Sequence, residues 1–493
     1  MSGKSILILV LVLVYLFAVV LGIGVRELRR RQGAKDEFAL AGKSMGLWEV
    51  GLTSGLAILG AVHVLGYFEM SWFVGAAVLW FSIGCALALA VVSATTGRWA
   101  RGLGVSTAYE LVGVATGSRA LGVVAVCVGA PLIWGVLTLE TQGLGIVLSA
   151  LTGLPLQYAV MLGAVIGILY VFLAGMKQIA RLNLINTGVL YVGGVVSALY
   201  LGFVLPRGWS GVSEFYLSQN QAWALSIMGA PGTLVSFGLV NVLALVLFHL
   251  SNQFLLQPML SAESVRTVRN AMWIAVPINA AFGVFTCAIG LAAKTQPQFA
   301  SLGAKLAAPS MLVAMLPWWL CAWLLASFML VILSTFSITC LAPATAFVKD
   351  IYVNLRRPDA SEREVERAIR LVMLLLAVAA VIPSMTLPPI VAAILWLYAW
   401  SVPVTVFVIL GLFWKRSPVA AAITWAVAWI ANALWTFTGL SAALGLSSLP
   451  GIYVVLLVSI VLGIVLTAAC QGEPGYFTSR RQANIGRAAS GDL

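Results

Sequence analysis

Charged residues are scarce in this chain. Only 9% of its 493 residues are Asp, Glu, Lys or Arg, whereas 61% are hydrophobic. So few charges could not cover the surface of a water-soluble globule of this length, which excludes that class of protein. The alternating pattern of a membrane β-barrel is missing as well. The composition therefore predicts an all-α polytopic membrane protein whose main solvent is lipid.

Two other residue types are also rare. The chain has six cysteines, all within apolar runs and without the spacing of metal ligands, so neither a disulfide framework nor a metal centre is expected. It has only two histidines, and the sequence contains no metal-spaced set of His, Asp and Glu and no nucleophile elbow. We therefore expect a protein that is not an enzyme and needs no cofactor.

Long apolar stretches, in contrast, are abundant. A helix of about 20 apolar residues crosses a bilayer, and stretches of that size occur thirteen times. They lie at approximately 5–23, 48–68, 73–94, 120–150, 155–174, 184–205, 234–256, 271–293, 311–348, 369–387, 390–413, 418–440 and 450–470. They predict one transmembrane domain at 1–470 with about thirteen transmembrane helices. The polar tail at 471–493 is expected to be disordered.

The basic residues are distributed unevenly. Twenty-four of the 28 Lys and Arg residues fall in seven hydrophilic segments that share one side if all thirteen stretches cross the membrane. These segments are 26–43, 98–119, 177–181, 266–269, 349–370, 415–416 and the tail from Arg480, and the other side keeps Lys4, Arg207, Lys294 and Lys305. Because cytoplasmic loops retain Lys and Arg, this asymmetry predicts a plasma-membrane protein with its N-terminus outside and its C-terminus in the cytoplasm.

The net charge of +12 arises at the ends of the apolar stretches and does not follow one helix face. It therefore indicates contact with the anionic headgroups of the lipid bilayer, and no nucleic acid is expected as a partner. No oligomeric state follows from the sequence.

Polar residues inside the apolar stretches are candidates for function, because a polar group in hydrocarbon is costly. Glu140 lies in the fourth stretch, and the two histidines, His63 and His249, lie in the second and the seventh. Ser334 and Thr335 lie in the ninth. For each of them the alternative is a hydrogen bond to a neighbouring helix or to a carbonyl of its own helix.

Four glycines, Gly51, Gly55, Gly60 and Gly66, recur through the second stretch. Glycine weakens a helix interior by about 1 kcal/mol relative to Ala, so one interpretation is an unwound segment with free carbonyls. Close packing of helices through small residues is the other interpretation, and the sequence leaves both open.

Several short motifs, in order along the chain, carry a resemblance to a known family. The run Leu333–Thr335, followed fifteen residues later by Asp350–Tyr352, resembles the eighth core helix of the sodium:solute symporter family. That family includes transporters of glucose, proline and sialic acid. Further matches in the expected order are Gly104–Leu111, Gly175–Lys177, Asn252–Ser264 and Gly411–Arg416. The resemblance covers nearly the whole chain.

The resemblance implies a leucine-transporter-like fold. It consists of two inverted repeats of five helices, here at about 48–205 and 234–413, with additional helices at both ends of the chain. The first helix of each repeat is discontinuous in this fold. The second and seventh stretches, which contain His63 and His249, are therefore expected to be broken.

The resemblance also implies a sodium site made of three backbone carbonyls and two hydroxyls, which offer a hard cation several neutral oxygens. In this chain they belong to Leu56, Leu59, Val331, Ser334 and Thr335. Some family members have a second sodium site with an Asp and two further hydroxyls, where this chain has Asn183, Ser337 and Ile338. We therefore expect a single sodium ion.

The substrate-binding residues that the resemblance implies are His63, Glu140, Phe248 and His249. Phe248 matches the aromatic gate of sugar-transporting relatives, but Phe73 and Leu245 stand where those relatives have a Glu and an Asn, which disfavours sugar. One acid with imidazoles and aromatic rings suits an amine or a zwitterion such as an amino acid. A carboxylate substrate held by a protonated His63 is the alternative.

We therefore expect a sodium-coupled secondary active symporter that imports a small polar organic solute by alternating access. A proton-coupled or monocarboxylate transporter of the same fold stays open, because Glu140 and His63 could titrate. A membrane sensor or scaffold is less favoured, because the 23 residues after Cys470 offer no room for a signalling domain.

Overall fold

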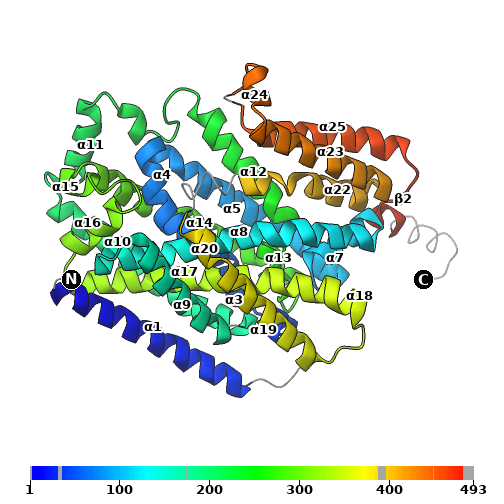
Figure 1. The fold of residues 1–493 in the computed structure, drawn as a ribbon, viewed down its shortest axis with the longest axis horizontal. Helices are drawn as coiled ribbons and strands as arrows, with labels where there is room; N and C mark the ends of the chain where they lie inside the picture. The colour runs from blue at the N-terminus through cyan, green and yellow to red at the C-terminus, as the bar shows by residue number, and fades with distance from the viewer. Residues whose placement is uncertain (1–2, 31–35, 174, 387–395, 448, 481–493) are drawn as a thin grey trace.

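The structure, a computed structural model, describes residues 3–30, 36–173, 175–386, 396–447 and 449–480. Long helices lie side by side through the molecule (Figure 1). They are α1 (Gly3–Arg30), α3 (Leu47–Ala57), α5 (Leu79–Ala94), α8 (Arg119–Thr152), α9 (Leu156–Leu173), α10 (Met176–Val204), α12 (Leu239–Ser251), α14 (Val265–Lys294), α17 (Trp318–Ala346), α19 (Glu362–Ala379), α22 (Val402–Phe413), α23 (Pro418–Phe437) and α25 (Gly451–Ala469). Shorter helices connect or extend them.

Many of these helices are suited to a bilayer. Among the described residues, nine helical segments are long and apolar enough to cross a membrane, and two shorter apolar helices lie at Gly3–Ala18 and Leu156–Val171. This confirms the expected all-α membrane class. The count of thirteen crossings stays a prediction.

The ninth apolar stretch is divided, contrary to the sequence-based boundaries. α16 (Ala307–Met315) ends before Pro317, and α17 begins directly after it. Leu316 is extended, with φ −75° and ψ 148°, as the residue before a proline generally is, because the proline ring disfavours its helical conformation. The membrane helix of this stretch is therefore α17 with its continuation η6 (Phe347–Val353).

α17 occupies the centre of the bundle and contacts α1, α8, α9, α10 and α19. Its most apolar window is completely buried within the protein. A helix that is hydrophobic on all sides is expected in such a position. The hydroxyls of Ser334 and Thr335 are consequently held in the interior and away from lipid.

Basic segments that are distant in the sequence meet at one end of the bundle. Lys43 Nζ donates to the carbonyl of Gly104 at 3.1 Å, and Arg101 Nε donates to the carbonyl of Ala262 at 2.7 Å. Lys349 forms an ion pair with Asp36. These contacts bring residues 36–43 together with segments 98–119 and 349–370 at one face, as the predicted charge partition requires.

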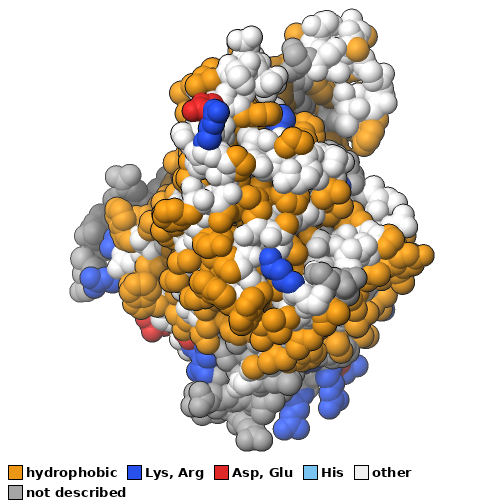
Figure 2. All heavy atoms as spheres, turned by 90° about the vertical axis from the view of Figure 1, so that its left-hand side faces the viewer, with side chains coloured by type: hydrophobic (Ala, Val, Ile, Leu, Met, Phe, Trp, Pro, Cys, Tyr) orange, Lys and Arg blue, Asp and Glu red, His pale blue; other side chains and the backbone are white. Residues whose placement is uncertain are grey.

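Two of the four basic residues that lie outside the seven basic segments make hydrogen bonds away from this face. Lys4 Nζ donates to the carbonyl of Leu316 at 2.7 Å, and Lys294 Nζ donates to that of Trp72 at 2.7 Å. Figure 2 looks onto the end of the molecule that carries α11 (Gly208–Ser218), α15 (Pro297–Ala300) and α16, where only scattered Lys and Arg side chains appear among hydrophobic ones. The chain begins at this end, whereas β2 (Glu473–Pro474) lies at the opposite end (Figure 1).

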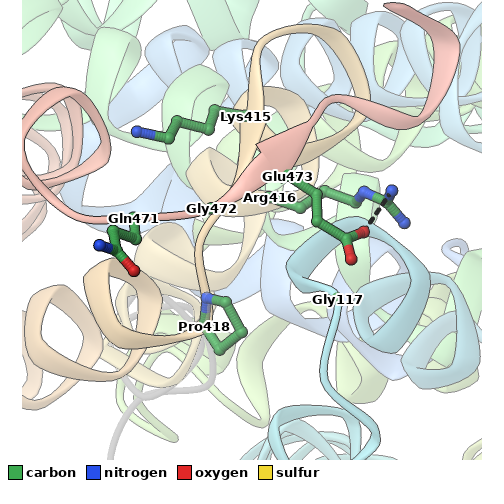
Figure 3. Close-up of a pocket in the computed structure, with 7 residues that line it drawn as sticks. All are labelled: Gly117, Lys415, Arg416, Pro418, Gln471, Gly472 and Glu473. Carbon is green, nitrogen blue, oxygen red and sulfur yellow. Dashed lines mark ion pairs between the residues drawn. The ribbon is translucent and has the colours of Figure 1, made fainter. Parts of the chain in front are cut away.

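The first part of the tail is ordered, so the expectation of disorder from residue 471 does not hold there. β2 pairs antiparallel with β1 (Lys415–Arg416), and Arg416 forms a 2.6 Å ion pair with Glu473. Figure 3 shows this pair beside the pocket formed with Gly117, Pro418, Gln471 and Gly472. Residues 481–493 lie outside the described residues.

Candidate functional site

The helix of the second apolar stretch is broken, as expected for the first helix of a repeat. α3 ends at Ala57, and η2 (Val62–Gly66) begins the second half, which continues as α4 (Tyr67–Val74). Between them the Leu59 N–H donates to the Leu56 carbonyl at 2.9 Å, in place of the usual helical bond. We refer to α3, η2 and α4 together as the first broken helix.

The glycines of this helix serve close packing at one position and lie at the break at another, where the carbonyl is hydrogen-bonded and not free. A Cβ atom on Gly51 would lie 2.7 Å from the Cβ of Ile274 on α14, so Gly51 serves close packing of α3 against α14. Gly60 lies at the break itself. Its carbonyl accepts hydrogen bonds from the N–H groups of His63 and Val64, each at 3.2 Å, which starts the second half of the helix.

The helix of the seventh stretch is broken at Asn252, between α12 and α13 (Gln253–Leu260). Asn252 is extended, with φ −108° and ψ 141°, and its side-chain oxygen accepts a hydrogen bond from Phe254 N at 3.1 Å. This is an ordinary N-cap of the second half. We refer to α12 and α13 together as the second broken helix.

Three of the five residues expected at the sodium site meet where α17 passes the break in the first broken helix. Thr335 Oγ1 lies 3.3 Å from the Leu56 carbonyl oxygen and 3.2 Å from the Val331 carbonyl oxygen. The Thr335 hydroxyl supplies the one hydrogen for both contacts, to the Leu56 and to the Val331 carbonyl oxygen. Such a group of neutral oxygens, buried among apolar side chains, is the donor set that a hard monovalent or divalent cation prefers.

Ser334 and Leu59 lie nearby but have other partners. Ser334 Oγ donates to the side-chain oxygen of Asn183 on α10 at 2.7 Å, a contact that the sequence analysis did not predict. Leu59 lies in the break and bonds to Leu56 through its N–H. Their roles as sodium ligands stay predictions.

His63 is fully buried on the second half of the first broken helix. Its ring stacks on Tyr67 and meets Phe81 edge-on, with a centroid distance of 5.2 Å in each case. Among the described residues, neither ring nitrogen finds a hydrogen-bond partner of standard geometry, although the Ile58 carbonyl lies close by. A buried imidazole with open nitrogens is able to bind a polar ligand.

His249 is also fully buried, at the end of α12. Its Nδ1 is 2.7 Å from the Leu245 carbonyl, so in the neutral ring Nδ1 carries the hydrogen. Nε2 is then an acceptor that has no partner within the described part of the chain. The adjacent Phe248 stacks on Tyr398 at a centroid distance of 3.9 Å. His63 and His249 are close enough to interact electrostatically.

Glu140 on α8 reaches the break in the first broken helix. Its Oε2 accepts a hydrogen bond from the Ala61 N–H at 2.7 Å, and the carboxylate covers Gly60, where a Cβ atom would lie 2.2 Å from Oε1. The bond to a neighbouring helix, which was the alternative for this residue, is therefore present. A role of Glu140 in substrate binding stays a prediction.

Sequence reasoning missed the aromatic residues of this region, Tyr67, Phe81 and Tyr398. Tyr67 follows His63 by one helical turn, a spacing that could have indicated the contact. Nothing in the sequence distinguishes Phe81 and Tyr398 from other aromatic residues in apolar runs. Within the described residues, no group of three or more His, Cys, Asp or Glu residues could hold a metal ion.

Comparison with known proteins identifies the family. The model of the sodium:solute symporter family matches residues 38–428, which is most of the chain. The chain belongs to the sodium:solute symporter family. It is similar to a sodium/glucose cotransporter of Vibrio parahaemolyticus, with 25% identity over 81% of this chain and 79% of that protein. It is equally similar to the uncharacterized symporter YwcA of Bacillus subtilis (strain 168), with 25% identity over 85% and 82%.

Solved structures of symporters have the same fold. A substrate-bound, outward-open structure of a Na+-coupled sialic acid symporter matches 95% of this chain and 98% of its own, with a TM-score of 0.80 and 17% identity. Mhp1, a nucleobase-cation-symport-1 family transporter, matches 88% and 95% with a TM-score of 0.54 and 14% identity. The expected leucine-transporter-like fold is confirmed, and this multi-pass membrane protein belongs to a family of transporters.

Proposed function

We propose that this member of the sodium:solute symporter family couples one sodium ion to the import of a small polar organic solute that carries an amine, such as an amino acid. The observation that carries the proposal is the convergence of the Leu56 and Val331 carbonyls with the Thr335 hydroxyl. These oxygens are neutral, so they suit a monovalent cation that must be released in every cycle.

One sodium ion is sufficient for concentrative uptake. A roughly tenfold sodium gradient supplies about 1.4 kcal/mol, and a membrane potential of about 100 mV adds about 2.3 kcal/mol per ion. Together they support roughly 500-fold accumulation of a neutral solute. Sodium binds first in this scheme, the solute follows, and movement of one helix bundle against the other exposes both to the cytoplasm.

The proposed solute lies between the two broken helices, near His63, Phe248, His249 and Glu140. Glu140 supplies the one acid of this set, and Phe248 stacked on Tyr398 supplies aromatic faces for an amine. A solute with a carboxylate is the second candidate, favoured by the open nitrogens of His63. The related sodium/glucose cotransporter acts on a sugar, which Phe73 and Leu245 disfavour here.

Uptake of a labelled panel of amino acids, amines, carboxylates and sugars into proteoliposomes, with sodium or with potassium outside, tests the proposal. We expect sodium-dependent uptake of an amine-bearing solute with a Hill coefficient for sodium near one. Uptake that follows a proton gradient and ignores sodium would contradict the coupling. A coefficient clearly above one would indicate an additional ion near Asn183 and Ser337.

The proposed orientation places the basic end of the bundle, including the start of α19, in the cytoplasm. Ser361 caps α19 by accepting a hydrogen bond from Glu364 N. A single cysteine placed between Ser361 and Glu366, on a cysteine-free background, is expected to react with an impermeant reagent only after the cells are opened. Labelling from outside intact cells would show that the orientation is the opposite of the one proposed.

A further inference from the structure

Glu140 is buried without the partner that a buried acid normally has. It is 1% exposed, and no ion pair to it occurs in the part of the chain that the structure describes. An uncompensated carboxylate in such a place is costly. The compensating group is the start of the second half of the first broken helix, because the first N–H groups of a helix lack internal partners and form the positive end of its dipole.

One peptide group of the break is hydrogen-bonded at both its N–H and its carbonyl, and Glu140 is the partner of the N–H. The Ala61 N–H donates to Glu140 Oε2 at 2.7 Å. The carbonyl of the same peptide group belongs to Gly60 and accepts from His63 N and Val64 N at 3.2 Å each. The Gly60–Ala61 peptide is thus fixed between α8 and the turn that follows it.

The fixed peptide lies next to two carbonyls that are expected to bind sodium, those of Leu59 and Leu56. Leu59 precedes Gly60 in the chain, and its N–H donates a hydrogen bond to the carbonyl of Leu56. The orientation of the Leu59 and Leu56 carbonyls therefore depends on the position of the Gly60–Ala61 peptide, which a side chain from another helix holds. Ion affinity depends on the positions of the ligand atoms to within a fraction of an ångström.

We infer that Glu140 is a positioning residue of the sodium site, which sets the sodium affinity by holding the Gly60–Ala61 peptide and does not touch the ion. This inference rests on the proposed sodium coupling. It differs from a role in substrate binding, because it concerns the oxygen bonded to Ala61 and applies when no solute is present.

The chain offers variants that separate the hydrogen bond from the charge. Glu140→Gln removes the charge but keeps an oxygen that accepts from Ala61. Gly60→Ala keeps the charge but displaces the carboxylate, because the new Cβ would lie 2.2 Å from Oε1 and 2.4 Å from Oε2. The atoms that this Cβ meets are the end of a flexible side chain, and Gly60 has no positive φ, so the backbone can accept alanine. Gly188→Ala is the matched control, since no described heavy atom beyond the adjacent backbone of α10 lies within 4 Å of its Cβ position.

The experiment measures the sodium concentration that gives half of the maximal thermal stabilisation of the purified protein, with sodium alone as the ligand and potassium keeping the ionic strength constant. We expect Gly60→Ala and Glu140→Ala to raise this concentration by about tenfold, the equivalent of one lost hydrogen bond. Glu140→Gln is expected to change it by less than about threefold, and Gly188→Ala not at all.

The outcomes are distinct. Unchanged sodium affinity in Gly60→Ala and Glu140→Ala would overturn the inference, as would a large change in Glu140→Gln with none in Gly60→Ala, because the charge alone would then act. Should Glu140→Ala fail to fold, Gly60→Ala and Glu140→Gln still decide between these results. Absence of any sodium effect on the unmodified protein would contradict the proposed sodium coupling itself.

Discussion

The two broken helices are interrupted and held by different means. In the first, the N–H that follows the break is bonded by Glu140, 79 residues away on α8. In the second, Asn252 caps the N–H of Phe254, two residues further on. A break held by a distant side chain depends on the packing of the whole bundle, whereas a break held by its own cap is a local property of the chain.

The difference also separates the two parts of the candidate site. The first broken helix presents the Leu56 carbonyl to Thr335 on α17, and its second half carries His63. The second broken helix carries Phe248 and His249 just before its break. Changes around the first break are therefore expected to affect the ion, and changes at the second break are expected to affect stability or the solute.

The largest expected effect comes from the hydroxyls of α17 that face the first break. The double variant Ser334→Ala, Thr335→Ala removes two proposed sodium ligands. Each lost ligand is expected to cost about tenfold in affinity, with partial compensation by water. We therefore expect the sodium concentration for half-maximal uptake to rise by about 30-fold or more. The measurement is the sodium dependence of uptake in proteoliposomes.

The matched control for this double variant is Thr339→Ala. Among the described residues, the hydrogen-bond partners of Thr339 Oγ1 are carbonyls of its own helix, those of Thr335 and Phe336. Its replacement should leave the sodium dependence unchanged. A double variant with the sodium dependence of the unmodified protein would show that the ion binds elsewhere.

Replacement of the two histidines tests whether both broken helices contact the solute. His63→Phe keeps a ring between Tyr67 and Phe81 but removes the open nitrogens, and we expect solute affinity to fall by about tenfold at saturating sodium. His249→Phe removes the open Nε2 and is expected to act similarly. Solute competition assays measure both effects.

The sodium half-saturation of the purified histidine variants, without solute, is the control and should change by less than about twofold. If His63→Phe lowers solute affinity and His249→Phe does not, the solute contacts the first broken helix alone. If neither variant changes it, the proposed solute site is wrong.

The smallest effect is expected at the second break. Asn252→Ala removes the cap of α13 and should lower the free energy of unfolding by about 1 kcal/mol. Sodium affinity should stay the same, because the proposed ion ligands lie on the first broken helix and α17. Thermal unfolding in detergent measures the change, and Asn252→Ser, which retains a capping oxygen, should restore most of it. A loss of sodium affinity in Asn252→Ala would mean that the two breaks are not independent.

Much of the fold was predictable, because lipid imposes simple constraints on a sequence. Apolar runs of bilayer length specify membrane helices. The uneven distribution of basic residues predicts on which side their ends lie, and that stays a prediction. The boundary at Pro317 was equally available in the sequence, since proline cannot continue α16. The pairing of β2 with β1 was not, because two-residue strands have no recognisable pattern.

The same distinction between what the sequence predicts and what the packing decides applies to the candidate site. The sequence by itself, through its motifs and its few intramembrane polar residues, determined which side chains are candidates for the site: His63, His249, Glu140, Ser334 and Thr335. Only the tertiary structure decided their partners, because the hydrogen bond that Ala61 donates to Glu140 and the one that Ser334 donates to Asn183 join residues 79 and 151 positions apart. The high cost of a polar group in hydrocarbon marks a residue from its sequence context alone. Which group relieves that cost depends on how the helices pack, and no local pattern in the chain records it.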